Sequence, residues 1–280
     1  MSLEDEFSDI IKKARTGQLR SVADVSRASG LAESEITQLE RGHVPRHRDQ
    51  VSAMANALGL RPGPLGQIAS GAWEPYAVKN VHGLETIRGS IGGYEVKGYV
   101  LHDGAEAVMI DTGYNPQAML EMLTRRGLRL RAICLTHGHT DHAEGIQAIL
   151  DQHPVPVYLG PGDRDLLNWT PPDDRLLAPQ DGDTIRAGGL TIRFIETPGH
   201  TPGGVCYRVE AGAEAMCFVG DTLFAGSIGR SNPATLYGTH LESVRQRVLK
   251  LPDEVVLFPG HGPATTVQQE LAHNPFSLPT

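Results

Sequence analysis

The stretch THGHTDH, residues 136–142, places three histidines and an aspartate directly after the apolar run RAICL. A short apolar run of this kind is typical of a buried strand. His137 and His139 stand two positions apart at its end, so their side chains can point to the same side. Imidazole and carboxylate groups are ligands for zinc, iron or manganese. The stretch therefore predicts a metal site where a strand leaves its sheet, although Asp141 taken alone could instead cap the helix that follows.

Three further polar residues follow apolar, strand-like runs in the same way. They are His200 in TPGHTPGG, Asp221 in FVGDTLF and His261 in FPGHGPA. The flanking glycines and prolines let the backbone turn sharply there, and loops at one sheet edge can gather such residues around one cavity. We therefore expect one site that contains all of them together with the first cluster. The remaining histidines are interpreted as surface or incidental residues: His43, His47, His82, His102, His153, His240 and His273.

The sequence pattern changes near residue 80. Beyond it, strand-like runs such as 94–102 and 106–113 alternate with helical patterns such as 116–127 and 143–153, which is typical of an α/β body. Residues 161–180 could form a flap over the site, with Trp169 as an apolar wall, or an ordinary surface connection. No apolar run is long enough to span a bilayer and no signal peptide is seen, so we expect a cytoplasmic protein without membrane contact.

Residues 4 to about 70 contain only helical patterns. Four helices are predicted, over 6–15, 21–30, 31–42 and 48–60, and the second begins with a Ser21 cap and ends at Gly30. Two short helices joined by a glycine-containing turn are the helix-turn-helix signature. Glycine and proline are frequent in 61–80, which is interpreted as a linker. We therefore predict two domains, 1–72 and 73–280.

The first domain resembles the Cro/CI (XRE)-type helix-turn-helix family, through ITQLERG and MANALGL, over about 55 residues. Ala32 departs from the usual Ser or Thr cap. The resemblance implies that Ser34, Glu35, Thr37 and Gln38 face the major groove of DNA, that Arg41, Arg46 and Arg48 contact phosphates, and that the protein binds as a homodimer. The alternative is a helical packing or dimerisation module, which is favoured by the balance of nine basic and nine acidic residues in 1–72.

Residues 80–275 resemble the metallo-β-lactamase-fold family, through HGHTDH, His200, Asp221, His261 and Asp111 in VMIDTG. The resemblance implies an α/β (α+β) four-layer αβ/βα sandwich with two divalent metal ions, zinc or else iron or manganese. It implies one metal on His137, His139 and His200, a second on Asp141, His142 and His261, and Asp221 as the bridge. Asp111 is expected to support the ligands from behind through hydrogen bonds.

Such a centre generates a bridging hydroxide that attacks an activated carbonyl, with Asp141 and Asp221 as the catalytic carboxylates. GDTLFAGSIGR and the ending FPGHGPATTVQQELAHNPF resemble the short glyoxalase II-like hydrolases, which implies a thioester substrate. Arg230 is then a candidate contact for an anionic group of the substrate, or else a surface residue.

Three alternatives stay open. A persulfide dioxygenase would hold one iron through His137, His200 and Asp221. GRSNPATLYG stands where both the short glyoxalase II-like hydrolases and such dioxygenases often have GRTDF, and this altered loop slightly favours a hydrolase. A lactonase would use the same two-metal centre to open a lactone. A transcriptional regulator would use the metal domain as a sensor and the helical domain to bind DNA. The net charge of −8 comes from residues 73–280, which argues against nucleic acid binding by that part.

Overall fold

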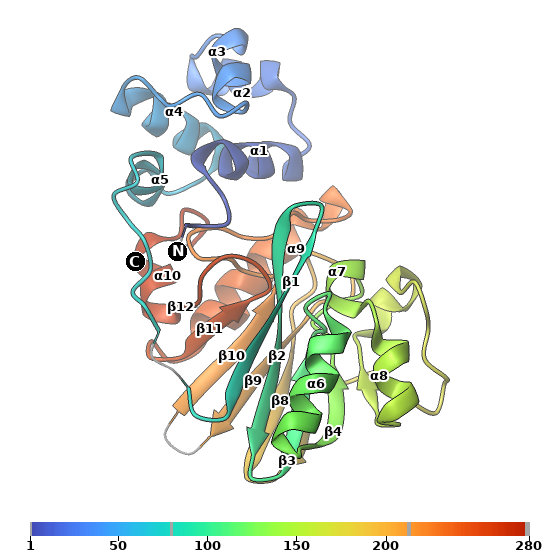
Figure 1. Ribbon diagram of the computed structural model, residues 1–280. Coiled ribbons are helices and arrows are strands. Elements are labelled where there is room, and N and C mark those ends of the chain that lie inside the picture. The colour runs from blue at the N-terminus through green and yellow to red at the C-terminus, as the bar shows by residue number, and fades with distance from the viewer. Residues whose placement is uncertain (1, 79–80, 212–213, 278–280) are drawn as a thin grey trace.

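Two six-stranded sheets form the body of the protein in a computed structural model that describes residues 2–78, 81–211 and 214–277 (Figure 1). The first sheet contains, in spatial order, β1 (Leu84–Ile91), β2 (Tyr94–Asp103), β3 (Glu106–Ile110), β4 (Arg129–Cys134), β5 (Val157–Tyr158) and β6 (Leu176–Leu177). The second contains β12 (Thr265–Thr266), β11 (Val256–Pro259), β10 (Glu214–Gly220), β9 (Val205–Ala211), β8 (Leu190–Glu196) and β7 (Thr184–Ala187).

Strand pairing changes from antiparallel to parallel within each sheet. β3, β4, β5 and β6 are parallel neighbours in the first sheet, and β10 and β11 are parallel neighbours in the second. Helices α6 (Pro116–Arg126) and α8 (Ile146–Gln152) connect the parallel strands of the first sheet, and α9 (Tyr237–Glu242) lies in the connection from β10 to β11. Short 3-10 or π turns complete the connections at 161–166, 234–236, 243–247 and 248–250.

Alternating side chains of the strands supply separate apolar cores. In β9 and β10, Tyr207 and Phe218 point between the two sheets, whereas Cys206 and Cys217 point to the outer face. Outer-facing residues of the first sheet pack with α6 and α8, and those of the second pack with α9 and α10 (Val267–His273). The layers are therefore helix, sheet, sheet and helix (Figure 1), which confirms the predicted αβ/βα sandwich.

The helical front consists of α1 (Phe7–Gly17), α2 (Val22–Ser29), α3 (Glu33–Leu39), α4 (Arg48–Leu58) and α5 (Pro62–Ala69). The α2 cap is as predicted, because the Ser21 side chain accepts from the Asp24 amide and Gly30 ends the helix with φ of 76°. The interpretation of 61–80 as a linker is wrong at its start. Residues 62–69 form α5, and Trp73 is buried.

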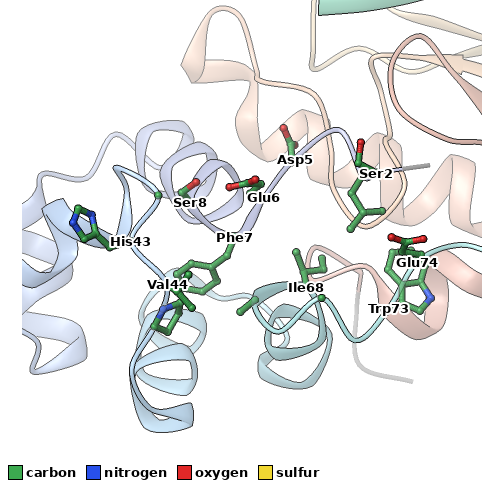
Figure 2. Close-up of a pocket in the computed structure, with 15 residues that line it drawn as sticks. Ser2, Asp5, Glu6, Phe7, Ser8, His43, Val44, Ile68, Trp73 and Glu74 are labelled. Carbon is green, nitrogen blue, oxygen red and sulfur yellow. The ribbon is translucent and has the colours of Figure 1, made fainter.

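The helical front and the sandwich share one apolar core. Ile10 and Ile11 of α1 belong to the same buried cluster as Leu223, Ile228 and residues of α10. Backbone contacts add to this packing, since the Arg61 amide donates to the Pro275 carbonyl at 2.9 Å. A cavity of about 340 Å³ lies between the start of α1, the turn after α3 and Trp73 (Figure 2). Among the described residues, no helix is long and apolar enough to cross a membrane.

Candidate metal centre

All the predicted ligand residues meet at one edge of the sandwich. His137, His139, Asp141 and His142 follow β4, His200 follows β8, Asp221 follows β10 and His261 follows β11. His139 occupies the N-cap position of the short helix α7 (Thr140–Ala143), which turns the chain so that Asp141 and His142 face the same centre. The site is thus assembled from loops that lie far apart in the sequence but begin next to one another at the same edge of the two sheets.

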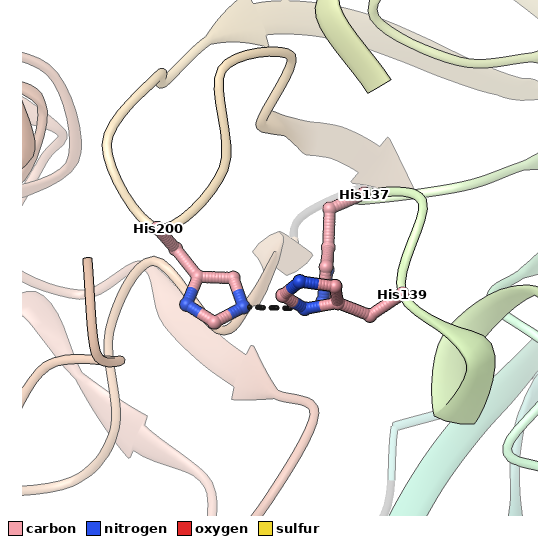
Figure 3. A group of neighbouring side chains, drawn as sticks. All are labelled: His137, His139 and His200. Carbon is pink, nitrogen blue, oxygen red and sulfur yellow. Dashed lines mark hydrogen bonds between the residues drawn. The ribbon is translucent and has the colours of Figure 1, made fainter. Parts of the chain in front are cut away.

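His137, His139 and His200 form the first group of ligand atoms (Figure 3). One ring nitrogen from each lies within 4.8 Å of the others. Nε2 of His200 is 3.0 Å from Nδ1 of His139, and the rings of His137 and His200 stand at 90° to one another. Three imidazoles that converge in this way can hold one divalent cation.

Asp221 lies between this group and a second one. Its Oδ1 is 3.3 Å from Nε2 of His142, and its Oδ2 is 3.6 Å from Nε2 of both His200 and His261. Asp141 completes the second group, with Oδ2 3.2 Å from Nε2 of His261. A carboxylate with one oxygen near each of two groups has the geometry of a bridging ligand.

Buried polar atoms without hydrogen-bond partners gather at this place. Of four such side-chain atoms found in the described residues, three are Nε2 of His137, Nε2 of His142 and Oδ1 of Asp221. Leaving a buried donor or acceptor unsatisfied costs about 1–3 kcal/mol. A cation among these lone pairs would remove that cost, so the residues present fit a metal site.

Hydrogen bonds behind the ligands fix the orientation of the rings. Nδ1 of His200 donates to the Arg230 carbonyl at 2.7 Å, and Nδ1 of His261 donates to the Glu95 carbonyl at 2.6 Å. Because a carbonyl can only accept, each Nδ1 carries the proton and each Nε2 keeps a lone pair for a metal. Asp111 accepts from Nδ1 of His142 at 2.8 Å and from Thr136, the supporting geometry expected for it.

Burial and neighbouring charges shift the pKa values of the ligand side chains in opposite directions. Burial lowers the pKa of His200 to about 4, although Asp221 opposes this shift. Burial also acts against the charge on His142, but Asp221 and Asp111 raise its pKa well above the usual value. Burial would raise the pKa of Asp221, yet His261 and His142 lower it well below the ordinary range. Asp221 is therefore an ionised carboxylate, the form that can act as a metal ligand.

Lys97 of β2 forms hydrogen bonds with the residues on both sides of His261. The amide of Lys97 donates to the Gly260 carbonyl at 2.9 Å, and its ammonium group donates to the Gly262 carbonyl. Burial lowers the pKa of this lysine to about 8. Lys97 thus anchors the turn that carries His261.

Two supporting residues were missed by the sequence analysis. Asp163 is fully buried and accepts from the Gly138 amide at 3.0 Å, the Thr201 hydroxyl at 2.6 Å and the Gly203 amide at 2.6 Å. It therefore ties the loop of His137 and His139 to the loop of His200. The interpretation of His240 as surface or incidental is wrong, because it is fully buried and its Nε2 donates to the Thr222 carbonyl at 2.8 Å.

The residues predicted to contact substrate or DNA lie outside this cluster. The side chain of Arg230 is exposed at the end of a buried loop. Ser34, Gln38, Arg41, Arg46 and Arg48 are exposed, whereas Glu35 and Thr37 are half-buried. Glu35 accepts from Gln50, and Thr37 donates to the Glu33 carbonyl at 2.8 Å. Their roles stay predictions.

Known proteins are similar to the sandwich. Residues 91–261 match the model of the metallo-beta-lactamase superfamily, so α1 to α5 lie outside the match. The hydroxyacylglutathione hydrolase GloC of Haemophilus influenzae is 31% identical over 190 residues, which cover 62% of this chain and 88% of that protein. The BLEG-1 B3 metallo-beta-lactamase is 33% identical with a TM-score of 0.61, covering 69% of this chain and 98% of that one. TTHA1623, solved in a di-iron-bound form, is 31% identical with a TM-score of 0.58, covering 68% and 99%.

Proposed function

The chain belongs to the metallo-beta-lactamase superfamily, and from this premise we propose that it is a thioester hydrolase with two divalent metal ions. The observation that carries the proposal is the pair of ligand groups joined at Asp221. The 31% identity to a hydroxyacylglutathione hydrolase supports a thioester as the substrate.

The distances between the side chains support a division of the ligands into two sets. His137, His139 and His200 would hold one ion. His142, His261 and Asp141 would hold the other, and Asp221 would serve both, since its oxygens lie near His142 and His200. Zinc, iron and manganese all suit this set of nitrogen and oxygen donors.

Two ions bound here would supply a water of lowered pKa near neutral pH and would polarise the carbonyl of the substrate. Asp141 is half-buried, with its Oδ2 against His261, and its pKa is lowered although burial acts in the opposite direction. It is therefore an ionised group that can accept a proton from the attacking water. Arg230, exposed at the rim, is placed to meet an anionic group on the substrate.

A substrate panel tests the proposal. Metal-loaded protein should hydrolyse an acyl-glutathione thioester faster than an acyl-homoserine lactone, and should not consume oxygen with glutathione persulfide. Arg230→Ala should raise KM for the glutathione thioester more than it lowers kcat, because it removes binding and not chemistry. Oxygen uptake with the persulfide and no thioester hydrolysis would contradict the proposal.

The rival with one iron makes a separate prediction. It needs only His137, His200 and Asp221, so His139→Ala would leave most iron and activity in place. In a two-metal centre the same substitution removes a ligand whose ring nitrogen lies 3.0 Å from that of His200, and metal content should fall. Metal analysis of this variant beside His153→Ala, a half-buried histidine outside the site, separates the two.

We propose further that the helical front binds DNA as a homodimer, through the exposed start of α3. Exposed Ser34, Gln38 and Arg41 on or next to α3, together with Arg46 and Arg48, support this. In a transcriptional regulator, the sandwich would sense a metal ion or the substrate of its metal centre, and the helical front would bind DNA.

Fluorescence anisotropy with a random-sequence duplex at several salt concentrations tests DNA binding. Replacing Arg41 and Arg46 together with alanine should weaken binding and reduce its salt dependence. Arg186→Ala, an exposed arginine on β7, is the matched control and should leave binding unchanged. Binding by the double variant that equals the control would contradict the proposal.

A further inference from the structure

The loop after β10 determines where two parts of the metal centre lie. Residues 221–231, here called the Asp221 loop, begin with the bridging carboxylate and contain the Arg230 carbonyl that orients His200. Residues 221–229 are all buried. Any shift of this loop would therefore move Asp221 and His200 relative to the other ligands.

A charged pair from the helical front holds the middle of this loop. Lys13 of α1 donates to the Ile228 carbonyl at 3.0 Å and to the carboxylate of Asp5 at 2.5 Å. Asp5 in turn accepts from the Ser227 hydroxyl at 2.5 Å. The Lys13 and Asp5 side chains are only 11% and 8% exposed, so water cannot replace these partners easily.

The same segment also approaches His261. The ammonium group of Lys13 lies 4.9 Å from the ring centre of Phe224, which stands 5.8 Å from the ring of His261 in an edge-on arrangement. A Cβ atom on Gly262, the next residue, would lie 3.0 Å from Cβ of Glu4. The chain just before α1, which carries Asp5 (Figure 2), thus packs against both the Asp221 loop and the turn of His261.

α10 and Trp73 hold the other side of the loop. The Gly226 amide donates to Glu270 at 3.0 Å, and Asn274 donates to the Ser227 carbonyl at 2.9 Å. A Cβ on Gly226 would come within 2.8 Å of the Trp73 ring. These contacts leave the Ile228 carbonyl and the Ser227 hydroxyl to the helical front, which lies outside the family match.

We propose that Asp5 and Lys13 are positioning residues of the metal centre, which they serve by fixing the Asp221 loop. The inference rests on the proposed two-metal site. It makes the helical front a structural part of that site, in addition to any role in binding DNA.

Cobalt(II) is the probe for the test, because its visible absorption reports the ligand geometry directly. Lys13→Met removes the charge and both donated bonds while keeping an unbranched apolar chain. We expect cobalt to bind about tenfold or more weakly, the effect typical of losing a group that orients a ligand, with a changed spectrum and unchanged helical circular dichroism. Lys13→Arg, which keeps a cationic donor, should restore most of the affinity.

Lys12→Met is the matched control, since Lys12 is the exposed neighbour on α1 and the chemical change is identical. If Lys13→Met binds cobalt with the affinity and spectrum of this control, the inference is overturned. If Lys13→Met fails to fold, Asp5→Asn decides in the same way, with a weaker shift in the same direction expected. Wild-type protein that binds no cobalt would instead overturn the proposed function itself.

Discussion

Asp221 contacts both ligand groups, and the proposed centre depends on it more than on any other residue. One carboxylate oxygen faces His142, and the other lies between His200 and His261. Asp221→Ala removes the only carboxylate shared by the groups in the described site. Bound metal should therefore fall from about two equivalents to about one or fewer, with loss of turnover. Asp253→Ala, at an exposed position, should keep both, and near-normal metal content in the Asp221 variant would contradict the assignment.

Asp163 supports the first ligand group through two backbone amides and the Thr201 hydroxyl. Its two oxygens accept three hydrogen bonds, from the loops of His139 and His200. Asp163→Asn turns one oxygen into an NH₂ group that cannot accept, so at least one donor loses its partner, at a cost of about 1–3 kcal/mol. Urea unfolding should show this loss, and Asp165→Asn, exposed in the same short helix, should not. Equal stability of the two variants would show that Asp163 has no such role.

The ligands could be predicted from the sequence, but their supports could not. His200, Asp221 and His261 each stand in a glycine-rich turn after an apolar run, which is a local pattern. Asp163 and His240 have no such signal, because each acts on residues that only the fold brings near. Lys13 is a further case, since its partner Ile228 is 215 positions away.

At the scale of elements, helix ends could be predicted from the sequence where capping residues mark them. α2 ends at Gly30 as predicted, because glycine adopts the left-handed conformation required there. α5 was missed because its PGPLG start reads as a linker, although proline is well suited to the first turn of a helix. Tertiary packing against α10 then favours the helix over the loop.

α10 carries a buried carboxyl group with a pH-dependent effect on stability. Burial raises the pKa of Glu270 to about 7, although Asn274, Thr265 and the Gly226 amide oppose the shift. The folded state therefore binds this proton more tightly than the unfolded state, and the stabilisation is lost as pH rises from about 4.5 to about 7.

Glu270→Gln removes this titration. Relative to wild type, metal-free Glu270→Gln should gain about 1–3 kcal/mol of unfolding free energy between pH 5 and pH 8. Urea unfolding at both pH values measures the change, with Glu242→Gln, exposed on α9, as the control. A difference from wild type that is the same at both pH values would show that Glu270 keeps its charge in the folded protein.

At the scale of the whole molecule, the helical front and the sandwich form one packed unit. α1 contacts the Asp221 loop through Lys13, and it contacts the C-cap of α3 through a paired contact between Arg15 and Glu40. The metal centre and the proposed DNA-reading helix are thus joined by a single helix. The boundary predicted near residue 72 marks where the sequence changes from helical patterns to strands alternating with helices. The apolar core continues across this boundary, from the helical front into the sandwich.

Deletion of residues 1–72 should therefore damage the sandwich. It uncovers Leu223 and Ile228 in the Asp221 loop and removes Asp5, the carboxylate that accepts from the Ser227 hydroxyl. The truncated protein should bind a hydrophobic dye, aggregate more readily and retain less metal. A well-folded fragment with the metal content of the full chain would show that the front is only an attached module.

The most direct test of the central claim is elemental analysis of the full-length protein purified without added metal. Two groups of ligands joined at Asp221 predict about two equivalents of zinc, iron or manganese per chain. About one equivalent of iron alone would contradict a two-metal hydrolase and would favour the persulfide dioxygenase.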